Sequence, residues 1–164
     1  MRFTAQEEYG LRCLLQMARN EQGSLTIREI AEREGLSQAY VGKLMRVLRQ
    51  SGLVSSTRGQ KGGYQLSQPS DRITLSEVLR GLGGPLYSSE FCDQHSGELK
   101  SCAHTDDCSI RPLLSGIAQR VDSLFQGIAL KDLLQSERSM GQWVEGRLIG
   151  ISKAPKHMAP TVAH

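Results

Sequence analysis

Apolar residues in the first fifty positions recur at the spacing of amphipathic helices. Residues 6–20 hold apolar side chains at positions i, i+3, i+4 and i+7, which places them on one face of a helix. A shorter helix is predicted over 27–34, because Thr26 and Glu29 form a capping box at its start and Gly35 follows its end.

A third helix follows, with Ser37 as its expected N-cap. Its predicted inward residues are Val41, Leu44, Met45 and Leu48, and its outward residues include Gln38, Lys43, Arg46 and Arg49. Segments 53–57 and 62–66 are then predicted to form two short strands, joined by a tip that holds glycine and lysine. The order of helix, helix and β-ribbon is that of a winged helix-turn-helix.

The second half of the chain has a different pattern. Thr74 and Glu77 form another capping box, which predicts a further helix. Residues 86–108 lack helical periodicity and are predicted to form a loop. A long helix is expected from about Ser109, because Pro112 is tolerated only in the first turn of a helix.

The apolar stripe of this long helix is wide for a helix that packs on one side only, and it suits packing against a partner chain. The stripe comprises Ile110, Leu113, Leu114, Ile117, Val121, Leu124, Phe125 and Ile128. One more short helix is predicted over 130–134. Beyond Ser139 the periodicity fades, and a flexible C-terminal tail is expected.

These elements predict a mainly α fold with a small β-wing, namely a winged helix-turn-helix followed by a long dimerisation helix. The predicted parts are a DNA-binding domain over 1–82, a cysteine-containing loop over 83–108, a dimerisation helix over 109–136 and a C-terminal tail over 137–164.

Composition narrows the function classes. The 164-residue chain is 38% hydrophobic, which suffices for a core. No run approaches about 18 apolar residues, and the N-terminus lacks the apolar segment of a signal peptide, so we expect a cytoplasmic protein without a membrane span. The sequence shows no phosphate-binding loop, dinucleotide fingerprint or nucleophile–base pairing, so we do not expect an enzyme.

Charge is concentrated in the N-terminal half. The whole chain has a net charge of +3, but residues 1–70 hold ten Lys/Arg and six Asp/Glu, a net of +4. Residues 35–70 contain five basic residues and no acidic one. Such a surface suits a polyanion, because a carboxylate would repel phosphates and each phosphate contact releases counterions. We therefore predict binding to double-stranded DNA, against the alternative of solvated surface charges.

In a winged helix-turn-helix the third helix enters the major groove with its N-terminal residues at the base edges. The predicted reading residues are Ser37, Gln38, Ala39 and Tyr40. Gln38 suits an adenine edge, whereas Lys43 and Arg46 are expected on phosphates. Arg58 or Lys61, at the tip of the wing, is expected in a minor groove.

Three of the four cysteines lie in the predicted loop. They are Cys92, Cys102 and Cys108, separated by nine and five residues. Thiolates bind soft metals and iron–sulfur clusters, but three of them leave a fourth ligand to be supplied elsewhere. His95 or His104 would complete a zinc site of three cysteines and one histidine, and unliganded thiols are the remaining alternative. Cys13 lies among apolar residues of the first helix and is predicted to pack as one of them.

Several segments share their pattern with one protein family. They are residues 1–4, 9–12, 30–37, 40–41, 52–59, 62–66, 74–78 and 130–134. Together they resemble the Rrf-two family of winged-helix bacterial transcription regulators, which has IscR-like and NsrR-like members. The similarity covers residues 1 to about 136, and the Arg-Gly and Gly-Gly-Tyr of the wing are its most specific part. It implies a homodimer with crossed long helices, and it implies that Arg58 enters the minor groove.

The resemblance also implies an iron–sulfur cluster, of two-iron or four-iron type, on Cys92, Cys102 and Cys108. The chain departs from the IscR type, because the first cysteine gap is long and Arg111 replaces the histidine three residues after the last cysteine. NsrR-like members take their fourth ligand from an acidic residue on the first helix of the other subunit, where this chain has Glu8. Glu8 of the partner protomer is our predicted fourth ligand, with His95 and His104 as alternatives.

We thus predict a repressor whose affinity for its operator is controlled by an iron–sulfur cluster that senses iron, nitric oxide or redox state. The alternative is a regulator of the same fold without a cluster, which uses thiol oxidation or zinc. A module that presents the wing surface to an acidic protein is a third possibility.

Overall fold

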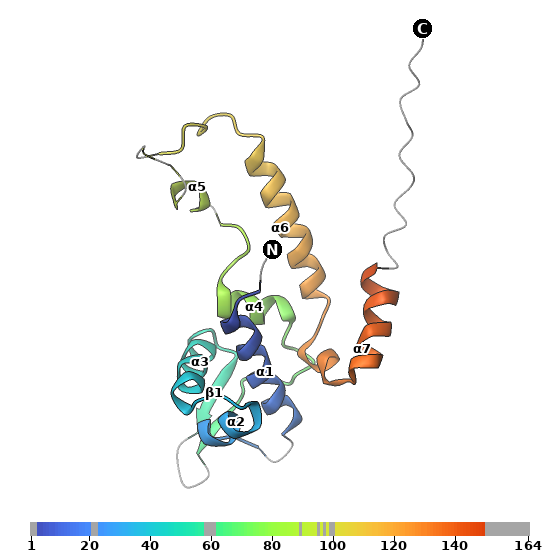
Figure 1. Cartoon of the computed structure of the whole chain (residues 1–164). Coiled ribbons are helices and arrows are strands. Elements are labelled where there is room, and N and C mark those ends of the chain that lie inside the picture. The colour runs from blue at the N-terminus through green and yellow to red at the C-terminus, as the bar shows by residue number, and fades with distance from the viewer. Residues whose placement is uncertain are drawn as a thin grey trace. The chain divides into compact units, whose positions relative to one another are not determined.

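The structure is a computed structural model that describes residues 3–20, 23–57, 62–88, 90–94, 96, 98 and 101–149. Its contacts divide the chain into two units, Met1–Leu134 and Gln135–His164. The elements of the first unit are α1 (Ala5–Arg19), α2 (Ile27–Glu34), α3 (Gln38–Gln50), β1 (Val54–Thr57), β2 (Gly63–Leu66), α4 (Leu75–Gly83), α5 (Phe91–Gln94), α6 (Ile110–Gln126) and the 3-10 helix η1 (Leu130–Leu134) (Figure 1). This arrangement confirms the predicted mainly α fold with a small β-wing.

Reciprocal capping boxes fix the starts of three helices. Thr26 Oγ1 accepts the N–H of Glu29 at 3.2 Å, while the Glu29 carboxylate accepts the N–H of Thr26 at 2.8 Å. The predicted box of Thr74 and Glu77 starts α4 in the same way. A third box, at Thr4, starts α1 and was not predicted. Each box satisfies N–H groups that a helix start would otherwise leave unpaired.

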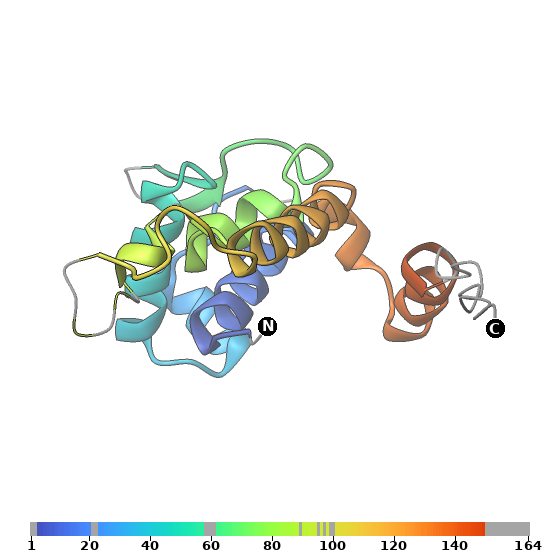
Figure 2. The ribbon, with the colours of Figure 1, turned by 90° about the horizontal axis from the view of Figure 1, so that it is seen from above.

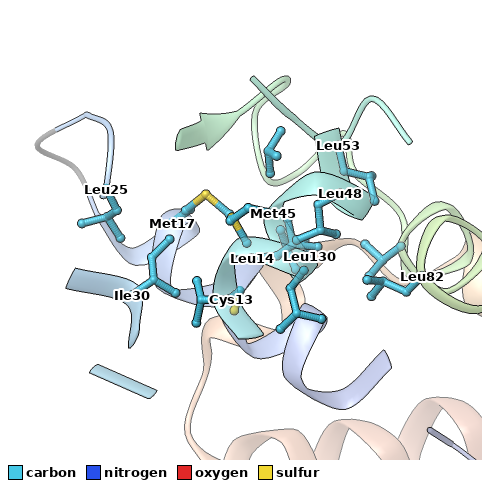
Figure 3. Close-up of a cluster of buried hydrophobic side chains, with 14 of the residues drawn as sticks. Cys13, Leu14, Met17, Leu25, Ile30, Met45, Leu48, Leu53, Leu82 and Leu130 are labelled. Atoms are coloured by element: carbon cyan, nitrogen blue, oxygen red, sulfur yellow. The ribbon is translucent and has the colours of Figure 1, made fainter. Parts of the chain in front are cut away.

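The core lies where α1 to α4, the base of the wing and η1 meet, as the close-up of its side chains shows (Figure 3). All four predicted inward residues of α3 are buried, namely Val41, Leu44, Met45 and Leu48. Cys13 is fully buried among them, and burial raises the pKa of its thiol to about 12. Cys13 is therefore a packing residue, as predicted.

The wing is anchored to the helices by a backbone bridge. β1 and β2 pair antiparallel, with Val54 opposite Leu66. Leu25, which precedes α2, also exchanges two backbone hydrogen bonds with Tyr64, at 2.8 and 2.7 Å. The close approach requires glycine at position 63, since a Cβ on Gly63 would lie 2.6 Å from the Leu25 carbonyl oxygen. The tip of the wing at 58–61 lies outside the described residues.

α6 is a long helix that packs beside α4 and extends beyond it (Figures 1 and 2). It starts after Ser109 with Pro112 in its first turn, as predicted. None of its residues is buried, and several apolar side chains are strongly exposed, namely Ile110 (61%), Leu113 (60%), Ile117 (54%) and Leu124 (39%). After α6 the chain returns to the core, where Ala129 bridges to Thr74 and Leu130 is fully buried.

Three described elements were not predicted. α5, at Phe91–Gln94, is a single turn within the predicted cysteine loop. In the second unit, α7 (Glu137–Val144) and the π-helical turn η2 (Glu145–Ile149) lie where a tail was expected. No helix among the described residues is long and apolar enough to cross a membrane.

Candidate cysteine site and nucleic-acid interface

The start of α3 combines structural and accessible residues. Ser37 Oγ accepts the N–H of Tyr40 at 3.2 Å and so caps the helix. Tyr40 is half-buried and meets the ring of Tyr9 edge to face, with 5.9 Å between ring centroids. Gln38 and Ala39 are exposed. Among the four predicted reading residues, Gln38 and Ala39 are therefore accessible, whereas Ser37 caps the helix and Tyr40 packs against Tyr9.

The basic residues of α3 lie on its exposed side. Lys43, Arg46 and Arg49 are exposed, and the apolar residues between them face the core. This arrangement gives α3 a cationic outer face with no carboxylate in its own sequence. Arg58 and Lys61, the predicted minor-groove residues, lie outside the described residues.

Arg12 of α1 holds the end of α2. Its Nε lies 2.6 Å from Glu34 Oε2, and its Nη2 donates to the Glu34 carbonyl at 3.2 Å. Gln16 donates to the other carboxylate oxygen of Glu34, whose side chain is only 7% exposed. The same guanidinium lies over the ring of Tyr9 at 5.3 Å, and Tyr9 contacts Tyr40. α1 therefore fixes both the turn of the helix-turn-helix and the start of α3.

The two carboxylates at the start of α1 differ in their surroundings. Glu7 accepts hydrogen bonds from the N–H and the hydroxyl of Thr4, at 2.7 and 2.8 Å. The Glu8 side chain is 63% exposed, and its ion pair with Arg12 spans 3.8 Å. Exposed ion pairs of this kind contribute little. Glu8 can therefore turn to an outside ligand, whereas Glu7 is committed to capping.

All four cysteines are free thiols, but the three loop cysteines are half-buried, whereas Cys13 is buried. Cys92 lies on α5, and Cys102 and Cys108 lie in the segment before α6. The backbone N–H of His104 donates to Cys102 Sγ at 3.5 Å. Across the part of the chain that the structure describes, no three His, Cys, Asp or Glu side chains are grouped as metal ligands. His95, the other histidine alternative, lies outside that part.

Cys92 and Cys108 nevertheless lie near the same two side chains. Arg111, Tyr87 and Cys92 line the same hollow, and the charges of Cys92 and Cys108 both act on Arg111 and Tyr87. Contact with Cys92 raises the pKa of Arg111, and burial followed by Cys92 raises the pKa of Tyr87. An open hollow of about 740 Å³ lies beside this group, lined by Cys92, Tyr87, Arg111 and four further residues. In the sequence, Arg111 stood out only because it replaces the histidine of IscR-like members, and nothing in the sequence indicated a role for Tyr87.

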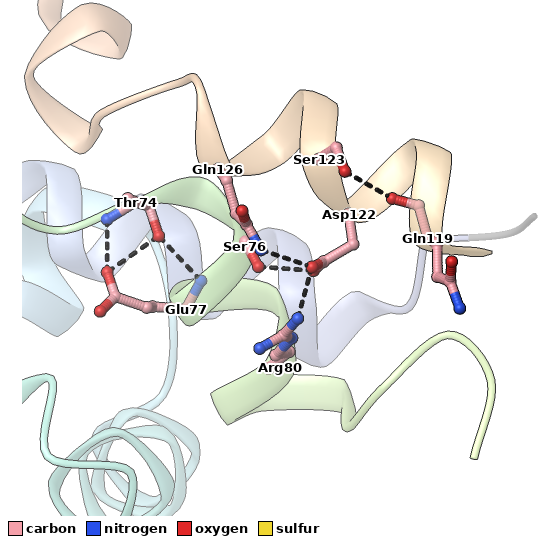
Figure 4. Close-up of polar contacts among 8 residues, drawn as sticks. All are labelled: Thr74, Ser76, Glu77, Arg80, Gln119, Asp122, Ser123 and Gln126. Carbon is pink, nitrogen blue, oxygen red and sulfur yellow. Dashed lines mark hydrogen bonds and ion pairs between the residues drawn. The ribbon is translucent and has the colours of Figure 1, made fainter. Parts of the chain in front are cut away.

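A polar junction joins α6 to α4 (Figure 4). Ser76, which is buried, donates to Asp122 Oδ1 at 2.6 Å. Arg80 donates to the other oxygen, to which Gln126 also donates at 2.8 Å. The Ser76 hydroxyl, then Arg80 and Gln126, lower the pKa of Asp122. Because α6 buries none of its own residues, this junction is a main attachment of the long helix.

The helix-turn-helix, its anchored wing and the cationic face of α3 define a winged-helix DNA-binding protein with cysteines placed beside a long helix. Comparison with known families is consistent with this class. The chain belongs to the Rrf2 family, described as an iron-dependent transcriptional regulator, whose profile matches residues 3–136. It is accordingly a DNA-binding transcriptional regulator and not an enzyme.

Individual relatives agree with the family. The HTH-type transcriptional regulator IscR of Xenorhabdus nematophila is 30% identical over 138 residues, which cover 84% of this chain and 81% of that protein. The structure of CymR, the global cysteine regulator of B. subtilis, has a TM-score of 0.63 and 29% identity, and it covers 82% of this chain and 96% of its own. The structure of IscR from T. potens has a TM-score of 0.62 and 27% sequence identity. The match covers 82% of this chain and 86% of the T. potens chain.

Proposed function

We propose that this chain is a dimeric repressor whose affinity for its operator is controlled by an iron–sulfur cluster. Cys92, Cys102 and Cys108 of one protomer and Glu8 of the other would hold the cluster. The proposal is carried by a difference in burial among the four thiols. Cys13 is fully buried in the core, whereas the other three are half-buried in one short segment. A packing role explains Cys13 and leaves the other three without a function.

The donor set suits such a cluster. Cys92 lies on α5 and lines a hollow, and Cys102 and Cys108 lie in the segment before α6. Thiolates are the usual ligands of iron–sulfur clusters. The exposed carboxylate of Glu8 is an oxygen donor with only a weak partner of its own. When bound, the cluster supplies iron–sulfur bonds that iron loss, nitric oxide or oxidation can break.

Contacts within the chain offer a path from the cysteine segment to α3. The segment leads into α6, and Asp122 attaches α6 to α4. α4 in turn contacts α1, where Gln6 donates to the Leu82 carbonyl and Gly10 lies against the Leu82 side chain. α1 positions α3 through Tyr9. A change at the cysteines can therefore move the DNA-reading helix relative to its counterpart in the dimer, which is coupling through a two-state element.

Anaerobic reconstitution followed by visible spectroscopy tests the cluster. Cys92→Ser, Cys102→Ser and Cys108→Ser are each expected to abolish most of the absorbance, because each removes a soft ligand. Cys13→Ser is the matched control and should keep the spectrum. Absorbance that survives all three loop substitutions, or a parent protein that stays colourless, would contradict the proposal.

The fourth ligand is tested by two carboxylate-to-amide changes one residue apart. Glu8→Gln should make the cluster more sensitive to oxygen, because it removes an anionic oxygen donor. Glu7→Gln should have no such effect, since glutamine at this position still completes a capping box. If the cluster instead bleaches in His104→Ala and survives in Glu8→Gln, the fourth ligand lies within the cysteine segment.

DNA reading and dimerisation belong to the same proposal. Gln38 would contact an adenine edge, with Lys43 and Arg46 on phosphates and Arg58 in the minor groove. The exposed apolar stripe of α6 would be covered by the α6 of a second copy, because soluble proteins rarely leave such a surface open. Light scattering of the parent protein should give twice the 18.1 kDa chain mass.

A regulator of the same fold that uses thiol oxidation or zinc is the second candidate. Its thiol-oxidation form is favoured by one observation, that the described side chains form no group of three candidate metal ligands. Metal analysis of anaerobically purified protein separates the two candidates. Iron with sulfide supports the cluster, whereas zinc, or no metal with a reversible disulfide, supports the alternative.

A further inference from the structure

Arg111 makes contacts that its exposed position does not suggest. It lies in the first turn of α6, yet its guanidinium donates to the backbone carbonyls of His104 and Thr105, both at 3.2 Å. It also lines the same hollow as Cys92 on α5, and Cys92 raises the pKa of its guanidinium. Arg111 therefore bonds the arm over 101–108 and lies beside the arm that carries Cys92.

A guanidinium is suited to this task and unsuited to ligating metal. Its five N–H donors form a rigid, planar fork, so that one group can bond two carbonyls and a sulfur together. Arginine has no acceptor and remains protonated, so it cannot replace the histidine ligand that IscR-like members carry at this position. What Arg111 offers a metal site is position and charge.

We propose that Arg111 is a positioning residue that holds Cys92 close to Cys108 before a cluster binds and places a fixed positive charge beside the ligand sulfurs afterwards. The second half of this inference rests on the proposed function, and the first half concerns the cluster-free chain alone. Cys108 precedes Arg111 by three residues on the arm that the guanidinium holds, and Cys92 lines the same hollow as the guanidinium.

Thiol crosslinking of the cluster-free, full-length protein tests the first half. A short bifunctional bimane links two thiols only when they are close, and mass spectrometry identifies the Cys92–Cys108 product. Its rate is divided by the rate at which a monofunctional bimane labels Cys92, which removes changes in thiol reactivity. Arg111→Gln should lower this ratio by roughly fivefold or more, because two carbonyl hydrogen bonds no longer favour the closed segment.

Two further variants make the result specific. Arg120→Gln changes an exposed arginine on the same helix and should leave the ratio unchanged. Arg111→Lys keeps the positive charge but lacks the planar set of N–H donors, so its crosslinking ratio should also fall. This variant replaces Arg111→Gln in the test if Arg111→Gln does not fold. A parent protein that forms no Cys92–Cys108 product, or Arg111 variants that match the parent, would overturn the inference.

The reduction potential of the reconstituted cluster tests the second half. Local charge and hydrogen bonds to the sulfurs set such potentials. Arg111→Gln should shift the midpoint to a more negative value, while Arg111→Lys should stay near the parent. Equal potentials in all three proteins would refute the role of the charge. If the parent binds no cluster at all, the proposed function fails, and the crosslinking ratio still decides whether Arg111 positions the thiols.

Discussion

Replacement of Gly63 by alanine should detach the base of the wing. A Cβ at this position would lie 2.6 Å from the carbonyl oxygen of Leu25 and 3.2 Å from the N of Thr26. These neighbours are backbone atoms, which cannot rotate away as the end of a side chain can. β2 must therefore move away from Leu25, and the two hydrogen bonds between Leu25 and Tyr64 must lengthen or break.

The magnitude follows from those two bonds. A backbone hydrogen bond contributes about 0.5–1.5 kcal/mol net, so the loss of both should lower the free energy of unfolding by about 1–3 kcal/mol. Operator affinity should fall as well, because the wing would no longer be held against the helices. Urea denaturation followed by circular dichroism measures the first effect, and a salt-matched gel-shift assay measures the second.

Gly42→Ala is the control with the opposite sign. A Cβ on Gly42, inside α3, would meet only Ile27 Cδ1 at 3.8 Å, which is ordinary van der Waals contact. Glycine within a helix is less favourable than alanine, so this variant should gain up to about 1 kcal/mol. If Gly63→Ala unfolds at the same urea concentration as the parent, the backbone bridge does not anchor the wing and the reasoning fails.

Three further predictions concern other contacts. Glu34→Ala removes the buried carboxylate that Arg12 and Gln16 share, and it should lower the free energy of unfolding by about 1–3 kcal/mol. Urea denaturation measures this change, and an unchanged free energy of unfolding would show that the contact does not stabilise the fold. The pKa of Asp122 is lowered in the folded protein, so its contacts stabilise above the ordinary carboxyl pKa and lose effect as the pH falls through the lowered value. Asp122→Asn should therefore be less stable than the parent at neutral pH and equally stable in strong acid; a pH-independent difference would contradict this. Ile117→Asp should give monomers by light scattering with an unchanged helical spectrum, and persistent dimers would place the interface elsewhere.

Local features of the fold could be predicted from the sequence because their signals are local. The boxes at Thr26 and Thr74 and the buried face of α3 each depend on residues three or four positions apart. α5 escaped prediction because its four residues are too few to show a period. α7 escaped because its apolar positions are sparse.

Long-range contacts of the site had no such signal. Arg12 and Glu34 are 22 residues apart, and nothing in either neighbourhood marks them as a pair. Arg111 stood out only as a departure from a family pattern, and its contacts with two carbonyls depend on how the preceding segment folds. The chemistry of the thiols could be predicted from residue type, but their surroundings required the three-dimensional structure.

The return of the chain after α6 has an evolutionary consequence. Bridges between residues 73–75 and 128–130 close the base of the excursion that carries the cysteines, and among the described residues the hydrophobic core takes no member from 84 to 127. An insertion within the excursion therefore costs only loop entropy, about 0.6 kcal/mol for each doubling in length. The nine-residue gap after Cys92 is a change of this kind, with a small cost in loop entropy. Segments of different length and cysteine spacing can thus diverge on one unchanged DNA-binding module.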